Sequence, residues 1–391
     1  MKRYLAKAIS GDALALKKMA FISGPRQVGK TTLAKSFLRV AHNYYTWDDQ
    51  DFRVAWSRSP KTAVEARGPG PVVIDELHKD RRWKNRLKGM YDLNVCADGI
   101  IVTGSARLDL FRRGGDSLMG RYLPYRLHPF SVGERDVIKA PEAISSAGDV
   151  RFSPDDLLVL SGFPEPLLSG RQAHAKRWSR LRTERLLAED VRDLRAVSDL
   201  AAMRVLFDLL PSRVGSLLSI NSLQQDVGVA YATIRDWIAV LESLYQCFLV
   251  RPYSKRITRS LRAAPKLYLY DATRIPEQNR GARVENLVAL HLMKACHVWT
   301  DTAHGEFELY YLRDKEHREV DFVVTRQGVP WLMVECKSND VTPSKYVSHF
   351  AAQLGNPPHQ VQLVTRTGFE RLYAESGRLV ISWDRWLARL P

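Results

Sequence analysis

A glycine-rich run near the start of the chain has the residues of a phosphate-binding loop. It reads GPRQVGKTT over 24–32 and matches the pattern GxxxxGK[ST] at Gly24, Gly29, Lys30 and Thr31. The glycines allow a loop whose backbone N–H groups turn inward on phosphates, and the helix that begins here adds its positive end. Lys30 supplies a point charge for the β and γ phosphates, and the Thr31 hydroxyl is placed to ligate Mg²⁺. The run therefore predicts a site for ATP, lined by Gly24, Pro25, Arg26, Gln27, Val28, Gly29, Lys30, Thr31 and Thr32.

A second group of reactive side chains ends an apolar run. The segment VVIDE covers 72–76 and closes with Asp75 and Glu76. We expect Asp75 to hold the Mg²⁺ directly or through water, and Glu76 to orient and polarise the attacking water as the hydrolytic base. Two acids could also simply be a solvated strand end, but the phosphate-binding run upstream favours the catalytic interpretation.

Polar and basic side chains follow the next apolar run. VTGS (102–105) carries Thr103 and Ser105, which we predict to sense the γ-phosphate. One of the arginines beyond it could act as an arginine finger, in cis or toward a neighbouring subunit. Arg121 is favoured because Gly120 leaves its backbone room. The arginines in this stretch are Arg107, Arg112, Arg113, Arg121 and Arg126.

A third group lies near the C-terminus, in EVDFVV (319–324) and WLMVECK (331–337). Glu335 and Lys337 are two residues apart on a predicted strand, so they share one face, and Asp321 is the candidate acid on the preceding strand. Carboxylates arranged in this way ligate one or two Mg²⁺ or Mn²⁺ ions, and a lysine beside them assists the nucleophile or the transition state. The alternative is a half-exposed strand with alternating charges.

The loop between these two strands decides whether the acids meet. A two-residue turn at Gln327 and Gly328 would set Asp321 opposite Val334, on the wrong face. A three-residue loop through Val329 would set Asp321 opposite Glu335. Since Gly328 can take the positive φ that a three-residue loop with a bulge uses, we predict the longer loop. Acids on opposite faces would rule out the metal site.

The elements that position the first two groups alternate between strand and helix. Apolar runs of strand length at 19–24, 71–77 and 99–105, with a helical pattern at 31–40, predict an α/β domain with a buried parallel sheet. The segment RYLPYRL (121–127) adds a short strand.

Beyond a Pro/Gly/Ser-bearing stretch at about 139–154, residues 155–210 have a helical pattern. Residues 219–250 predict a short helix, a turn at Gly228 and a longer helix. Two strands, 248–253 and 266–271, follow and complete the outline of a winged helix. The connection 251–266 has six basic residues and no acidic one, and we expect it to contact a phosphate backbone. Winged helices also serve as spacers or protein-contact modules.

The C-terminal part has an α+β pattern. A helix is predicted over 281–295 and again around 344–354, and apolar runs predict the strands between and after them. The predicted strands are 307–313, 319–325, 331–338 and 361–365.

The amino-acid composition indicates which classes of partner the protein can have. Lys and Arg number 59 against 43 Asp and Glu, which gives a net charge of +16 and favours a nucleic-acid partner. The four cysteines form no CxxC pair, and no apolar stretch reaches the ~18 residues of a membrane span. We therefore expect a cytoplasmic protein without a structural zinc and without a membrane partner.

Taken together, the motifs resemble the AAA+ and related ASCE P-loop ATPases. The order GPRQVGKTT, WDD (47–49), VVIDELHK, VTGSARL and LMGRYLPYRLHPFS is similar to bacterial and archaeal AAA-type ATPases that carry a C-terminal domain of uncharacterised function, related to the PD-(D/E)XK nucleases. The resemblance covers essentially the whole chain. It implies an ATPase domain (1–138), a linker and helical region (139–210), a winged-helix-like domain (211–275) and a restriction-endonuclease-like α/β domain (276–391).

The same resemblance implies further roles in the C-terminal domain. Glu285, in RVENLVALHL, fits the extra acid on the first helix of the nuclease pattern, so that Glu285, Asp321 and Glu335 would ligate metal. Gln353 fits a recurring polar position after the active strand. Val320-Asp321 stands where the pattern has its PD dipeptide.

Three functions remain open on the sequence. The first is an ATPase that gates or powers a metal-dependent nuclease, with DNA as partner. The second is an ATP-dependent switch or remodeller whose C-terminal fold only binds nucleic acid or a protein. The third is a STAND-type signalling ATPase, in which nucleotide state controls formation of a homo-oligomer. A fold alone does not establish an activity.

Overall fold

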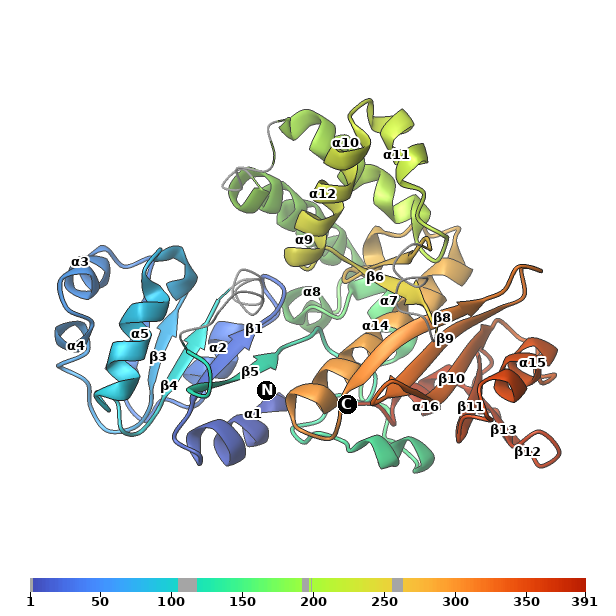
Figure 1. The fold of residues 1–391 in the computed structure, drawn as a ribbon, viewed down its shortest axis with the longest axis horizontal. Helices are drawn as coiled ribbons and strands as arrows, with labels where there is room; N and C mark the ends of the chain where they lie inside the picture. The colour runs from blue at the N-terminus through green and yellow to red at the C-terminus, as the bar shows by residue number, and fades with distance from the viewer. Residues whose placement is uncertain (1–2, 105–117, 192–196, 198, 255–262) are drawn as a thin grey trace. The chain divides into compact units, whose positions relative to one another are not determined.

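The computed structural model describes residues 3–104, 118–191, 197, 199–254 and 263–391 (Figure 1). Ser105, Arg107, Arg112 and Arg113, and residues 255–262 of the basic connection, lie outside the described residues. The chain forms two compact units. The N-terminal unit comprises Met1–Pro129, Arg135–Ile138 and Ser243–Tyr245, and the C-terminal unit comprises Phe130–Glu134, Lys139–Glu242 and Gln246–Pro391.

The N-terminal unit is built on a five-stranded parallel sheet with the order β2-β3-β4-β1-β5. Its central strands are buried along their whole length, as expected for a sheet covered on both faces. The predicted parallel α/β domain is confirmed. Its elements are α1 (Leu5–Ala8), η1 (Ile9–Leu14), β1 (Met19–Ser23), α2 (Lys30–Lys35), η2 (Ala41–Asn43), β2 (Tyr44–Thr46), α3 (Gln50–Arg58), α4 (Pro60–Ala63), β3 (Val72–Asp75), η3 (Leu77–Lys79), α5 (Trp83–Asp92), β4 (Ile100–Thr103) and β5 (Tyr122–Arg126).

The helix after the glycine-rich run is shorter than predicted. The apolar spacing indicated a helix to Val40, but α2 ends at Lys35. The Ser36 hydroxyl donates to the backbone oxygen of Leu33 at 2.6 Å. Such a local bond competes with the helical pattern, which explains the early end.

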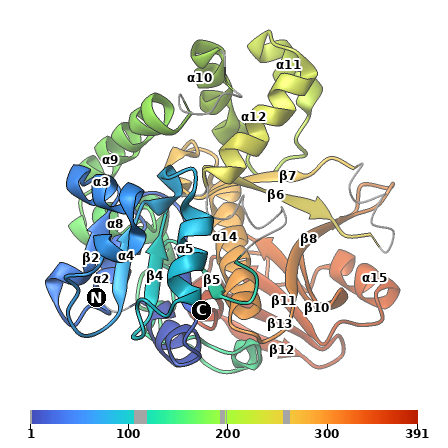
Figure 2. The same cartoon turned by 60° about the vertical axis from the view of Figure 1, so that its left-hand side comes forward.

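The C-terminal unit contains a mixed eight-stranded sheet with the order β12-β13-β11-β10-β9-β8-β6-β7. Figures 1 and 2 show α14 and α15 on opposite sides of this sheet. Its elements are η5 (Pro141–Ser145), α7 (Pro154–Leu160), α8 (Pro164–Ser169), α9 (Gln172–Arg185), η6 (Leu186–Val191), α10 (Leu200–Leu209), η7 (Leu210–Arg213), α11 (Ile220–Val227), α12 (Tyr231–Ser243), β6 (Cys247–Pro252), β7 (Lys266–Leu269), η8 (Ala272–Arg274), α14 (Arg280–Asp301), β8 (Phe307–Arg313), β9 (Glu319–Arg326), β10 (Val329–Lys337), α15 (Lys345–Gln353), β11 (His359–Val364), β12 (Glu370–Tyr373), β13 (Arg378–Ser382) and α16 (Trp383–Leu387).

The hairpin expected to form a wing is part of the C-terminal sheet. β6 and β7 pair antiparallel after α11 and α12, as predicted, but β6 also pairs parallel with β8. Apart from Ser243–Tyr245, the regions assigned from sequence to 139–210, 211–275 and 276–391 therefore lie in one compact unit, and Phe130–Glu134 belongs to it as well. The finer domain limits remain predictions.

Candidate functional site

The glycine-rich run forms a loop between β1 and α2. Gly24 has a φ of 144°, and a Cβ there would lie 2.2 Å from the backbone oxygen of Leu127, so only glycine fits. Gly29 ends the loop with a φ of 97°. The Lys30 side chain is 7% exposed and donates to the backbone oxygens of Gly24 (2.9 Å) and Pro25 (2.7 Å). The loop is thus curled around its lysine, as a phosphate cradle requires.

Asp75 is the centre of a cluster of hydroxyl groups at the carboxyl ends of the strands. The Thr31 hydroxyl donates to Asp75 Oδ2 at 2.7 Å, and the Tyr44 hydroxyl donates to the same oxygen at 2.9 Å. The Thr103 hydroxyl donates to Asp75 Oδ1. The structure therefore brings together the three sequence-predicted residues Thr31, Asp75 and Thr103.

This donor set fits a magnesium ion. Thr31 and Asp75 offer hard oxygen atoms, which Mg²⁺ prefers, and both stand beside the phosphate loop. All three partners of Asp75 in this cluster are neutral hydroxyls, so the carboxylate charge is not cancelled by a side-chain cation there. Thr31 and Asp75 are the residues that would hold the ion with its nucleotide.

Glu76, directly after β3, has an unusual backbone conformation. Its φ is 56°, in the left-handed region that few side chains adopt, and its N–H donates to the backbone oxygen of Thr103 at 3.0 Å. Burial raises the pKa of its carboxyl, while Lys30 and Lys79 oppose the shift. His78 Nε2 and Lys79 Nζ lie 3.8 and 3.6 Å from the Glu76 carboxylate. A carboxylate with a raised pKa is a better base near neutral pH.

The remaining residues predicted to line the nucleotide site lie on or beside the loop. Gln27 has a φ of 63°, Val28 is buried, and Thr32 is exposed on α2. Arg3 donates to the backbone oxygen of Val28 at 2.9 Å and so fastens the loop to the N-terminal segment. Sequence reasoning missed Arg3 and Tyr44, because neither belongs to a motif.

Arg121 was predicted to be an arginine finger, either in cis or toward a neighbouring subunit, and the structure places it away from the phosphate loop of its own domain; action toward a neighbouring subunit stays a prediction. Arg121 precedes β5, and its backbone oxygen accepts from Met19 N–H at the first residue of β1. The phosphate loop follows Ser23 at the other end of that strand, about 13 Å away at ~3.3 Å per residue. The guanidinium instead forms two bonds to Asp92, at 2.7 and 3.1 Å. Parallel pairing of β1 and β5 fixes this placement, which room at Gly120 could not reveal.

The C-terminal acids meet, but by a different route from the one predicted. The turn is the shorter one, Gln327 and Gly328, both with positive φ, and Val329 pairs with Arg326. A bulge between Pro330 and Leu332 then shifts the register by one residue. Val334 pairs with Phe322, so Asp321 falls opposite Glu335, and Asp321 Oδ2 accepts from the Cys336 N–H at 2.8 Å. The bulge restores the alignment that the longer loop was expected to provide.

Glu335 and Lys337 form the second part of this site. Lys337 Nζ lies 2.7 Å from Glu335 Oε1, and its side chain is 37% exposed. Burial raises the pKa of Glu335, while the bond to Lys337 opposes the shift. The other oxygen, Oε2, is buried and has no hydrogen-bond partner among the described residues. Gln353 lies exposed at the end of α15, where its amide bonds to His349 at 2.9 Å.

The Glu285 carboxylate already accepts hydrogen bonds from two side chains of the protein. Its Oε1 accepts from the Lys266 ammonium at 3.1 Å and from the Tyr268 hydroxyl at 2.6 Å. Lys266 also pairs with Glu319 and lies 4.0 Å from Asp321 Oδ1. Lys266, Tyr268 and Glu319 were not singled out from the sequence. Lys266 was counted with a basic connection, but it is 3% exposed and faces these acids.

The predicted three-carboxylate metal site therefore fits the structure poorly. Within the described part of the chain, no group of three His, Cys, Asp or Glu side chains is placed to hold a metal ion. Lys266 contacts Glu285 and lies 4.0 Å from Asp321, so two of the three predicted metal ligands already face a lysine. Among the described residues, no helix is long and apolar enough to cross a membrane.

Comparison with known families assigns the N-terminal region. Residues 16–135 match an AAA domain, so this part of the chain is an AAA-type ATPase domain. Residues 152–273 and 280–386 match two families described as domains of unknown function (DUF8612 and DUF4143). These matches leave the expected winged helix and nuclease-like fold as predictions.

Two curated relatives are similar over most of the chain. They are the uncharacterized proteins Rv2008c of Mycobacterium tuberculosis and Mb2031c of Mycobacterium bovis. Each is 24% identical over 327 residues, which covers 82% of this chain and 70% of the relative.

Solved structures give only a weak likeness. The Walker-type ATPase PABY2304 of Pyrococcus abyssi aligns with a TM-score of 0.38 and 14% identity, over 69% of this chain and 93% of that chain. The RuvB Holliday junction branch migration motor of Thermotoga maritima aligns with a TM-score of 0.29 and 17% identity, over 66% and 94%. Scores this low assign neither fold nor function.

Proposed function

We propose that this chain binds and hydrolyses ATP with Mg²⁺ and couples turnover to the binding of nucleic acid. The observation that carries the first part is the cluster around Asp75, in which Thr31 and Thr103 meet the carboxylate beside the loop that holds Lys30. These residues come from three separate segments of the region that matches an AAA domain, and their meeting around Asp75 supports the proposal.

Each residue of this site has its own role in binding or hydrolysis. Loop N–H groups and Lys30 bind the phosphates, and Lys30 exchanges its carbonyl partners for phosphate oxygens when nucleotide enters. Thr31 and Asp75 would hold a magnesium ion, which would neutralise charge on the phosphates. Glu76 orients the attacking water and accepts its proton, and Thr103 positions Asp75 and senses the terminal phosphate. Hydrolysis transfers the γ-phosphoryl group to water and gives ADP and phosphate.

ATP affinity tests the nucleotide site. We expect Lys30→Ala to abolish measurable binding of ATP with Mg²⁺ in a calorimetric titration, because the variant loses the point charge on the phosphates. Lys61→Ala, an exposed lysine on α4 of the same unit, is the control and should bind as the wild type does. Undiminished affinity in Lys30→Ala would refute the assignment of the loop.

The nucleic-acid partner is supported by the net charge of +16. A protein that neutralises phosphates releases counterions, so affinity for labelled double-stranded DNA should fall steeply with salt. Fluorescence anisotropy at several salt concentrations, with and without ATP, measures this slope. Absence of binding at low salt, together with ATP-dependent assembly of the chain, would favour a signalling switch instead.

Metal-dependent cleavage by the C-terminal unit is the second candidate. The alignment of Asp321 with Glu335 and the unpartnered Glu335 Oε2 favour it, whereas the lysine among the acids opposes it. Linear and circular DNA should be incubated with Mg²⁺ or Mn²⁺, with and without ATP, beside Lys337→Ala. Cleavage lost in the variant would establish a nuclease. No cleavage by the wild type, with ATP hydrolysis intact, would leave a switch or remodeller that binds nucleic acid or a protein partner.

A further inference from the structure

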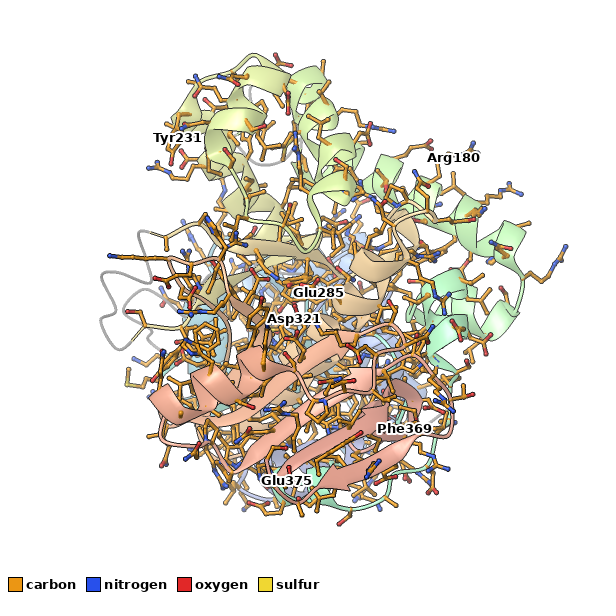
Figure 3. All side chains as sticks on the ribbon, turned by 90° about the vertical axis from the view of Figure 1, so that its right-hand side faces the viewer. Arg180, Tyr231, Glu285, Asp321, Phe369 and Glu375 are labelled. Carbon is orange, nitrogen blue, oxygen red and sulfur yellow. The ribbon has the colours of Figure 1, made fainter. Side chains whose placement is uncertain are left out.

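A buried lysine lies among three acids in the C-terminal unit. Lys266 begins β7, Glu285 lies on α14, and Glu319 and Asp321 lie on β9. Figure 3 shows Glu285 and Asp321 side by side. The Lys266 ammonium contacts Glu319, lies 3.1 Å from Glu285 Oε1, and lies 4.0 Å from Asp321 Oδ1. One cation is thus shared by acids from two elements.

The charges of this cluster are compensated within the chain. Burial disfavours the charged ammonium of Lys266, but the carboxylates of Glu285, Asp321 and Glu319 outweigh burial and raise its pKa. Glu319 also pairs with Arg313 at 2.8 Å. The ammonium of Lys266 therefore already provides a positive charge beside the carboxylates that a divalent cation would need.

The backbone around Lys266 fixes it in this place. Lys266 pairs with Val250 of β6 on one side, and the segment at Leu217 bridges to it on the other. Gly215, with a φ of 74°, passes so close that a Cβ there would lie 3.1 Å from Glu285 Oε2. Both partners of the Lys266–Glu285 pair are thus held by regular pairing and close backbone packing.

We infer that the ammonium group of Lys266 occupies the cation position of the C-terminal carboxylate cluster, so that a divalent metal binds there only if this lysine is displaced or removed. The inference does not depend on ATP turnover. It concerns the site that the second candidate function would use, and it predicts that the wild-type chain binds no divalent ion tightly at these acids.

Binding of Mn²⁺ to the nucleotide-free protein tests the inference directly. Titration followed by electron paramagnetic resonance counts bound ions without any assay of activity. We expect Lys266→Met to gain one site that binds Mn²⁺ at least about tenfold more tightly than the wild type, which corresponds to about 1.4 kcal/mol. Adding Glu285→Gln to that variant should abolish the gain, because the ion loses a carboxylate ligand.

Two control variants test whether Mn²⁺ binding depends on the positive charge at position 266 and on the place of the lysine that is removed. Lys266→Arg keeps the cation and should bind Mn²⁺ as weakly as the wild type does. Lys337→Met removes a partly exposed lysine that contacts Glu335, and it should not gain the site. Tight binding by the wild type that Glu285→Gln weakens would overturn the inference, even if Lys266→Met does not fold. Equal weak binding by a folded Lys266→Met would also overturn it.

Discussion

The two acid–lysine sites of this chain differ in how their charges are satisfied. Asp75 in the N-terminal unit is held by neutral hydroxyl groups, whereas Glu285 and Glu335 in the C-terminal unit each contact a lysine. A carboxylate whose partners are neutral can still attract a cationic ligand. A carboxylate that is paired with a lysine is already neutralised by a side chain of the protein. The presence of the right residue types therefore does not by itself make a site able to bind a metal.

The largest expected effect is on the free energy of unfolding of the lysine variants. Lys266→Met leaves Glu285 and Glu319 without their buried cation, and breaking a buried pair costs about 3–5 kcal/mol. Lys337→Met breaks a pair whose lysine is 37% exposed although its Glu335 is buried, and it should cost less than Lys266→Met, because Lys337 pairs with one carboxylate and is partly solvated. Denaturant unfolding of both variants measures the difference. Equal costs would break the distinction between a buried structural lysine and an exposed one.

The pH dependence of ATP turnover gives the next effect. Glu76 must be ionised to accept a proton from water, and its burial raises its pKa. Turnover should therefore fall as pH falls, and this loss should begin above the pH at which an ordinary glutamate, with a pKa of about 4.3, is protonated. The rate at saturating ATP should be measured from pH 5 upward, within the range in which the protein stays folded, with pH 8 as the reference. A flat profile down to pH 5 would remove Glu76 from the role of base.

A smaller effect is expected at Tyr44. Tyr44→Phe removes one of the hydroxyl groups that hold Asp75, so the Mg²⁺ concentration for half-maximal turnover should rise by about tenfold. The maximal rate at high Mg²⁺ should change little. Tyr45→Phe is the matched control, since Tyr45 packs against Phe52 of the core. An unchanged Mg²⁺ requirement in Tyr44→Phe would show that Tyr44 does not position the ligand.

The sequence predicts the parts of this molecule that depend on local pattern. The apolar runs locate β1, β3 and β4, and the motif spacing locates Lys30, Thr31 and Asp75. Contacts between distant segments were missed, because no local pattern encodes them. Tyr44 reaches Asp75 through the pairing of β2 with β3, and Lys266 reaches Glu285 through the packing of β7 with α14.

For the pairing of β9 with β10, the sequence predicted which residues face each other but not how the chain brings this about. The requirement that Asp321 meet Glu335 is met, but the turn is shorter than expected and a bulge at Trp331 makes up the difference. A bulge and a longer loop shift a strand by the same one residue, so the sequence could not distinguish them. Arg121 shows the opposite case, because the pairing of β5 with β1 puts it at the edge away from the phosphate loop.

Steady-state ATP hydrolysis by Glu76→Gln, measured beside nucleotide affinity, is the decisive experiment on the ATPase site. We expect the variant to bind ATP as the wild type does and to turn it over about 10²–10⁴ times more slowly, because only activation of the water is lost. Turnover equal to that of the wild type would contradict this expectation, as would a wild-type protein that binds ATP and never hydrolyses it.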